Sequence, residues 1–129
     1  MTLWWVAGIL ASIMAVVHAV VGERSLICRL RGESLPSSSL ADGGLAKTYL
    51  RACWHLVSAD LLTSAVVLFL CASARLGPVA AGLVAAHFAA YVLVAIGVIV
   101  QSRRFDAFWR VPQVYGLAGV ALLAWLGAA

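Results

Sequence analysis

The fold of this chain follows from one long stretch, LRACWHLVSADLLTSAVVLFLCASA, residues 50–74. It is long enough to cross a bilayer, because a membrane-spanning helix needs about 20 mostly apolar residues. Polar and ionisable residues nevertheless occur along it, namely His55, Ser58, Asp60, Thr63 and Ser64. Ionisable groups inside a membrane span are costly and therefore rare. The stretch thus predicts a transmembrane helix with polar positions that the rest of the fold must satisfy or use.

The composition of the whole chain points to a membrane protein. Of its 129 residues, 64% are hydrophobic and 11% are charged, whereas soluble domains carry about 25% charged residues. Such a chain cannot cover itself with polar surface, so we expect the lipid bilayer as a partner and no nucleic acid, despite the net charge of +4. Cys28, Cys53 and Cys71 lack CxxC spacing, which predicts free thiols.

The hydrophobic runs predict an all-α membrane protein: one domain, 1–129, built as a bundle of four transmembrane helices. The spans are expected at residues 3–22, 50–74, 79–100 and 111–128. The one long connection, 23–45, contains the turn-forming segment LPSSSLADGG. Asp42 is expected to cap a helix that begins near Leu45 and runs into the second span. Pro78 is expected to open the third helix after a short turn.

The first span has a face of small residues. These residues recur at steps of three and four and are Gly8, Ala11, Ser12, Ala15 and Ala19. Such a stripe lets another helix approach closely. His18 lies three residues after Ala15 and four before Gly22, which places it on the same face. We therefore expect His18 to point toward protein rather than lipid.

The basic residues predict the orientation of the spans. Eight of the nine Lys and Arg residues fall around the connections after the first and third spans: Arg24, Arg29, Arg31, Lys47, Arg51, Arg103, Arg104 and Arg110. Because basic residues favour the cytoplasm, the long loop is expected to be cytoplasmic and both termini periplasmic or extracellular, as in a multi-pass protein of a bacterial inner membrane. The residues of this rim suited to anionic lipid headgroups are Arg51, Arg103, Arg104 and Arg110.

The ionisable residues of the spans form a predicted polar core. At about 1.5 Å per residue, His18 and His55 both lie roughly 6 Å from the cytoplasmic ends of their spans, so they can face each other. Asp60 lies roughly 12 Å deep, Tyr91 roughly 15 Å and His87 roughly 21 Å. His55 and Asp60 are about 140° apart around their helix, so they cannot both face the same neighbouring helix. Together the five residues predict a ladder of polar groups that opens to the cytoplasm.

The ladder is compatible with three functions that the sequence alone does not separate. In the first, His18, His55, Asp60, His87 and Tyr91 line a proton-coupled transport or ion path, as Asp and His chains do in pumps. In the second, His18 and His55 bind haem or a transition metal in a redox subunit. Glu23 lies near them, although about 140° round from His18 on an ideal helix.

In the third, the chain is a non-catalytic accessory subunit that packs in a larger membrane complex or a homo-oligomer. A purely structural alternative stands beside all three functions. In it, each polar group only hydrogen-bonds a neighbouring helix and holds the bundle together.

Motifs of the common enzyme classes are missing from the sequence. There is no glycine-rich phosphate loop, no GxSxG and no HExxH. His55 and Ser58 do not suit a hydrolytic triad with Asp60, because they are neighbours on one apolar helix and no oxyanion donor is visible. We expect a protein that is not an enzyme and that, under the transport hypothesis, uses no cofactor and no metal.

Overall fold

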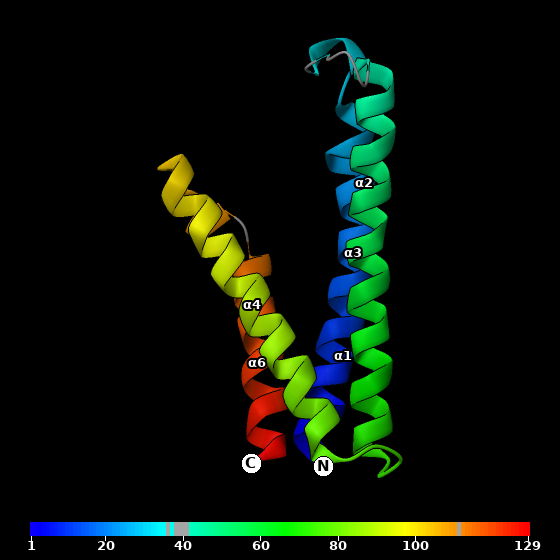
Figure 1. Ribbon diagram of the computed structural model, residues 1–129, viewed down its shortest axis with the longest axis vertical. Helices are drawn as coiled ribbons and strands as arrows, with labels where there is room; N and C mark the ends of the chain where they lie inside the picture. The colour runs from blue at the N-terminus through cyan, green and yellow to red at the C-terminus, as the bar shows by residue number, and fades with distance from the viewer. Residues whose placement is uncertain (36, 38–41, 111) are drawn as a thin grey trace. The chain divides into compact units, whose positions relative to one another are not determined.

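In the computed structural model, the protein is described over residues 1–35, 37, 42–110 and 112–129, and these residues form helices and turns without a strand. The long helices are α1 (Thr2–Val17), α3 (Gly43–Ala72), α4 (Pro78–Ser102) and α6 (Gln113–Ala128) (Figure 1). The shorter helical segments are η1 (His18–Gly22), α2 (Glu23–Ser25), η2 (Ile27–Arg29), η3 (Gly32–Ser34) and α5 (Ala107–Arg110). The prediction of an all-helical chain is confirmed for the described residues.

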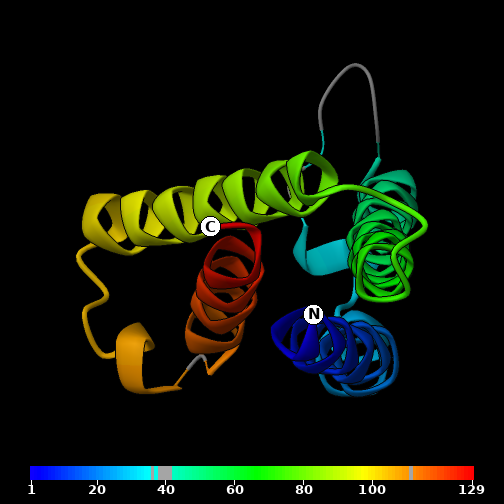
Figure 2. The ribbon, with the colours of Figure 1, turned by 90° about the horizontal axis from the view of Figure 1, so that it is seen from below.

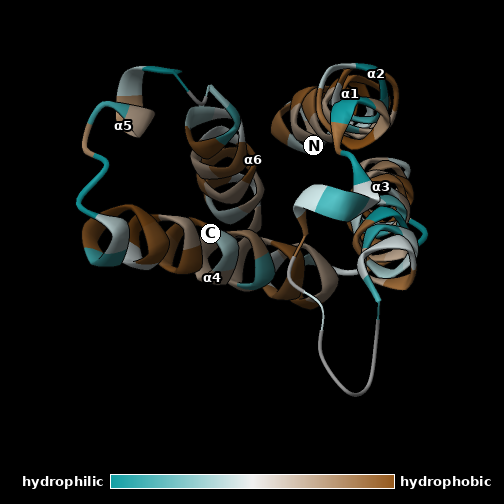
Figure 3. Cartoon of the chain, turned by 90° about the horizontal axis from the view of Figure 1, so that it is seen from above, coloured by the Kyte–Doolittle hydropathy of each residue, from teal (hydrophilic) through white to brown (hydrophobic). Residues whose placement is uncertain are grey.

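Three helical stretches are long and apolar enough to cross a membrane. They cover Thr2–Arg29, Gly43–Ala72 and Pro78–Ser102. α6 is apolar but has only 16 residues, and position 111, where the fourth span was expected to begin, lies outside the described residues. Figure 3 shows hydrophobic residues along most of the long helices and hydrophilic residues at the connections. The chain is therefore a helical protein with three candidate membrane spans.

The helix boundaries follow local signals in the sequence. The Oδ1 atom of Asp42 accepts the N–H of Leu45 at 2.7 Å, which confirms the predicted cap of α3. Pro78 opens α4, as predicted. Arg103 has a positive φ of 54° and closes α4 through its N–H and the carbonyls near the helix end. The proline- and serine-rich part of the expected loop, at 36 and 38–41, lies outside the described residues.

The helical conformation continues past residue 22, where the first span was expected to end. A π-helical turn, η1, leads directly into α2, and a 3-10 turn, η2, follows. Ile27 in η2 is only 1% exposed. The first part of the expected loop therefore packs as a continuation of the first helix, because its apolar residue has protein to bury against.

The chain divides into two compact units, and each is described by itself. One unit comprises residues 1–12 and 63–129, and the other comprises residues 13–62. In the first unit, α4 and α6 lie side by side (Figure 2). The indole Nε1 of Trp4 donates to the carbonyl oxygen of Ala124 at 3.2 Å, which ties α1 to α6. The rings of Trp5 and Phe69 pack at 5.3 Å between centroids.

The small-residue face of the first helix is confirmed. Gly8, Ala11 and Ala15 are buried. A Cβ atom on Gly8 would lie 2.6 Å from the ring of Phe69, so a larger residue there would require that ring to shift. The two long helices α1 and α3 can therefore pack against each other through small residues, as the sequence predicts.

Candidate functional site

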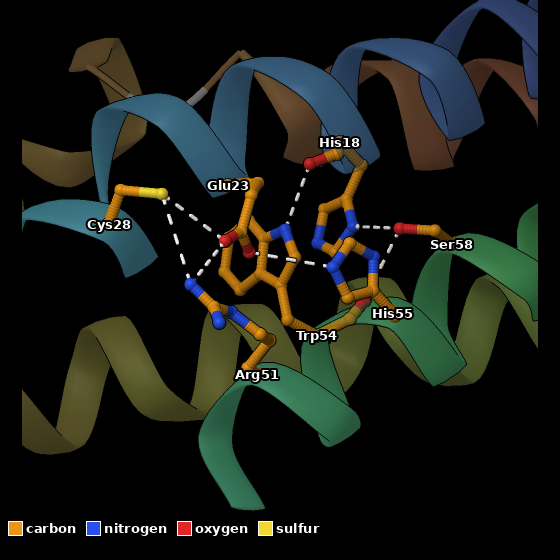
Figure 4. Close-up of polar contacts among 7 residues, drawn as sticks. All are labelled: His18, Glu23, Cys28, Arg51, Trp54, His55 and Ser58. Carbon is orange, nitrogen blue, oxygen red and sulfur yellow. Dashed lines mark hydrogen bonds and ion pairs between the residues drawn. The ribbon is translucent and has the colours of Figure 1, made fainter. Parts of the chain in front are cut away.

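Seven side chains in the unit of residues 13–62 form a polar cluster, here named the His–Glu cluster (Figure 4). Its members are His18, Glu23, Cys28, Arg51, Trp54, His55 and Ser58. The first three come from η1, α2 and η2, and the other four come from α3. The cluster therefore joins the end of the first candidate span to one face of the second.

The spacing along α3 explains why four of its residues meet in one place. Arg51, Trp54, His55 and Ser58 stand at positions i, i+3, i+4 and i+7. Residues with this spacing lie on one side of an α-helix. One continuous face of α3 therefore supplies a guanidinium, an indole, an imidazole and a hydroxyl to the cluster.

The π-helical turn η1 sets the direction of Glu23. On an ideal α-helix, Glu23 would lie about 140° round from His18. A π-helical turn contains one more residue than an α-helical turn, which rotates the residues after it back by about 100° and leaves about 40°. Glu23 therefore comes to the side of the helix that carries His18 without an end to the helix between them, because the turn itself changes the phase of the helix.

The two carboxylate oxygens of Glu23 have different surroundings. Its Oε1 accepts from Nη2 of Arg51 at 2.6 Å and from Sγ of Cys28 at 3.2 Å. Its Oε2 is buried and accepts no hydrogen bond from the described residues, and Nε2 of His55 lies 3.4 Å away. The side chain of Glu23 is 23% exposed and that of His55 is 47% exposed. Oε2 of Glu23, buried and without a hydrogen bond from the described residues, therefore faces the half-exposed imidazole of His55.

His18 is bonded to Ser58 of α3. Its Nδ1 and the Oγ of Ser58 are 2.9 Å apart. The hydroxyl of Ser58 also donates to the carbonyl oxygen of Trp54 at 3.3 Å.

Trp54 packs against the π-helical turn. Its ring stacks on the imidazole of His18 at 4.0 Å between centroids, with 7° between the planes. Its Nε1 donates to the carbonyl oxygen of His18 at 2.8 Å. Gly22 is buried under the indole, and a Cβ atom there would collide with the ring. Trp54 and Gly22 together therefore fix the backbone and the ring of His18.

The structure places the other predicted site residues outside the His–Glu cluster. Asp60 belongs to the same unit but is about 140° round α3 from His55. His87 and Tyr91 lie one turn apart on α4, in the other unit, with ring centroids 4.5 Å apart. The structure thus brings His18 and His55 together, and the ladder through Asp60, Tyr91 and His87 stays a prediction.

The hypothesis that His18 and His55 bind haem or a transition metal stays a prediction. Among the described residues, no three His, Cys, Asp or Glu side chains are grouped so that they could hold a metal ion. The guanidinium of Arg51 already occupies one oxygen of Glu23. Nδ1 of His18 is bonded to Ser58, which leaves one nitrogen of that ring for a ligand.

Three of the four arginines predicted to bind lipid headgroups pair with a carboxylate in the protein. Arg51 pairs with Glu23 inside the His–Glu cluster. Arg104 binds Asp106 through two hydrogen bonds of 3.0 and 3.1 Å, and Nε of Arg110 lies 3.5 Å from the same carboxylate. Arg103 closes α4. Their binding of lipid headgroups stays a prediction.

Sequence reasoning missed the roles of Arg51 and Trp54. Both stand with His55 and Ser58 at the spacing of one helical face, and this signal was present in the sequence. The contact of Glu23 with that face depends on the π-helical turn, for which the sequence shows no signal that we recognise.

Comparisons with known proteins add no family to this picture. No match to this chain was found among known protein families, curated proteins or solved structures. The geometry of the His–Glu cluster is therefore the ground on which a function is proposed.

Proposed function

We propose that this chain is a four-span protein of the bacterial inner membrane that conducts protons or couples their movement to a solute. In this proposal the His–Glu cluster takes up protons at the cytoplasmic side. One observation carries it: Oε2 of Glu23 is buried and accepts no hydrogen bond from the described residues, and it lies 3.4 Å from Nε2 of the half-exposed His55. In this pair, the carboxylate of Glu23 is a proton acceptor inside the protein, and the half-exposed His55 is a proton donor.

The chemistry of these groups suits proton transfer. Imidazoles exchange protons within the physiological pH range, and each ring can accept at one nitrogen while it releases from the other. A proton that arrives on His55 is attracted by the carboxylate of Glu23. Arg51 on the opposite oxygen balances that carboxylate when the proton has left. The cluster can thus hold a proton and release it without an unpaired buried charge at either stage.

The onward path in this proposal uses the predicted ladder. Asp60 follows the cluster along α3, and Tyr91 and His87 share one side of α4. Ionisable groups at membrane depth commonly serve as proton relays because they are too costly to keep otherwise.

The topology in this proposal makes α6 the fourth span. Its 16 residues rise about 24 Å, against a hydrocarbon core of about 30 Å. Local thinning of the bilayer accommodates such a mismatch at modest cost. Four spans put both termini on one side, and the distribution of basic residues makes that side the exterior.

The test is proton flux in liposomes that contain the purified protein and a pH-sensitive dye, driven by a potassium diffusion potential. We expect flux above that of empty liposomes, lost in Glu23→Gln and His55→Gln. Cys53→Ser is the control, because Cys53 is an exposed residue of α3 outside the cluster. Folded native protein with no more flux than empty liposomes contradicts conduction.

A strictly coupled transporter would show no flux without its solute, so a second measurement covers that case. Infrared difference spectra between acid and neutral pH report protonation of a carboxylate directly. We expect a carboxyl band that disappears in Glu23→Gln and persists in Cys53→Ser. The absence of that band, together with the absence of flux, would sink the proposal.

A further inference from the structure

We propose that the connection from Arg103 to Arg110 binds the headgroups of anionic phospholipids through Arg104 and Arg110. In this proposal, Asp106 pairs with the two guanidiniums while no lipid is bound and competes with the lipid for them. The inference concerns the unit that contains α4 and α6, and it does not depend on proton transport.

Two guanidiniums converge on one carboxylate in this connection. Arg104 binds both oxygens of Asp106, with Nε at 3.0 Å and Nη2 at 3.1 Å. Nε of Arg110 lies 3.5 Å from Oδ2 of the same side chain. A pair of guanidiniums around one set of anionic oxygens is also the arrangement that binds a phosphate. The carboxylate thus occupies the two guanidiniums that a headgroup phosphate can bind in its place.

The exposure of these three side chains shows that their ion pairs are not explained by a contribution to the stability of the fold. The side chains of Arg104 and Arg110 are 66% and 76% exposed, and that of Asp106 is 39% exposed. Ion pairs so open to solvent contribute little to stability. The arginines therefore have most of their surface available to a second anion.

The surroundings of the arginines are those of a membrane surface. The connection begins where α4, a candidate membrane span, ends at Ser102. Phe105 is 58% exposed and Trp109 is 86% exposed, on either side of Asp106 in the sequence. Exposed aromatic rings and arginines beside a span end are typical of the headgroup region, where both the ring and the charge are solvated favourably.

Charge complementarity selects anionic lipids over neutral ones. Arg103, Arg104 and Arg110 outnumber Asp106, the one acidic residue of the connection. The cytoplasmic leaflet carries anionic lipids, and basic residues near its surface are attracted to them. The basic residue of the connection between α3 and α4, Arg75, stands alone and lies at the opposite end of α4.

The test counts lipids that remain bound to the intact protein. The full chain is reconstituted in phosphatidylcholine vesicles with and without phosphatidylglycerol, and native mass spectrometry measures retained phosphatidylglycerol. We expect about a five-fold loss of retention in Arg104→Gln and in Arg110→Gln. Arg75→Gln carries the same charge change at the other end of α4 and should leave retention unchanged.

The variant Asp106→Asn should change lipid retention in the opposite direction. Removal of the competing carboxylate leaves both guanidiniums available to lipid, so retention of phosphatidylglycerol should rise. This variant keeps the proposal falsifiable even if an arginine variant does not fold. Native-like retention in the arginine variants, or a loss in Asp106→Asn as large as theirs, would overturn the proposal.

Discussion

Glu23 follows His18 by five residues, yet both side chains contact the same face of α3, at His55 and Ser58 respectively. An α-helix would have turned them apart by about 140°. The π-helical turn between them adds one residue and restores the alignment. The acid and the imidazole that make up the candidate site therefore meet because of a local irregularity in the first helix.

Gly22→Ala should disturb this arrangement. The new Cβ atom would collide with the ring of Trp54, which must then move off His18. Overpacking of this kind costs about 1–3 kcal/mol. We expect a lower unfolding temperature in detergent and a changed tryptophan emission. Gly82→Ala is the matched control, because a Cβ atom there meets nothing within 4 Å. Equal unfolding temperatures of the two variants would show that the ring of Trp54 can move without a loss of stability.

Ser58→Ala should destabilise the protein more than Ser12→Ala does. Ser58 bonds His18 on the neighbouring helix, and loss of the hydroxyl leaves Nδ1 of His18 without this partner. Bonds between membrane helices are worth about 0.6 kcal/mol on average and up to about 1.7 kcal/mol. The hydroxyl of Ser12 bonds only the carbonyl of Gly8 in its own helix. Reversible unfolding in mixed micelles compares the two variants, and an equal loss would contradict the bond across the helices.

Arg51→Gln and Glu23→Gln should be strongly non-additive. Either single change leaves one charge of a pair at 2.6 Å without its partner, whereas the double change removes both charges. The double variant should therefore lose much less stability than the sum of the two single losses. Thermal unfolding of the four proteins measures this coupling. Additive losses would mean that the pair contributes nothing as a pair.

The carboxyl group of Asp106 should titrate below its ordinary range. Hydrogen bonds from Arg104 favour the charged form and lower the pKa of Asp106, and the charges of Arg104 and Arg110 add to this effect. A lowered pKa in the folded protein means that the contribution to stability is fully present above the unfolded pKa. That contribution is lost as the pH falls through the folded pKa.

Carbon-13 shifts of labelled aspartate in the micelle-bound protein measure this titration. The Asp106 resonance should titrate at a higher pH in Arg104→Gln than in the native protein. Arg75→Gln should leave the titration unchanged, because Arg75 lies in the connection between α3 and α4, at the other end of α4. Identical titration in all three proteins would show that Arg104 does not hold the carboxylate in solution.

Local signals in the sequence determined most of the helical architecture. The apolar run of residues 50–74 predicts a membrane helix, and α3 contains nearly all of it. Asp42 and Pro78 mark the starts of α3 and α4, because a cap and a proline act on the adjacent turn and need no distant partner. The small-residue face that buries Ala11 and Ala15 follows from helical periodicity alone.

Only the tertiary structure decided which polar groups meet. The sequence places His18 and His55 at similar depths, but it does not show that Ser58 bonds one and Glu23 faces the other. Periodicity assumes a regular helix, and the π-helical turn breaks that assumption just before Glu23. Trp54 looks apolar in a hydropathy pattern, yet its ring and Nε1 hold His18. Such contacts depend on how each helix is rotated about its axis and on how closely the two helices approach. A pattern along the sequence contains neither quantity.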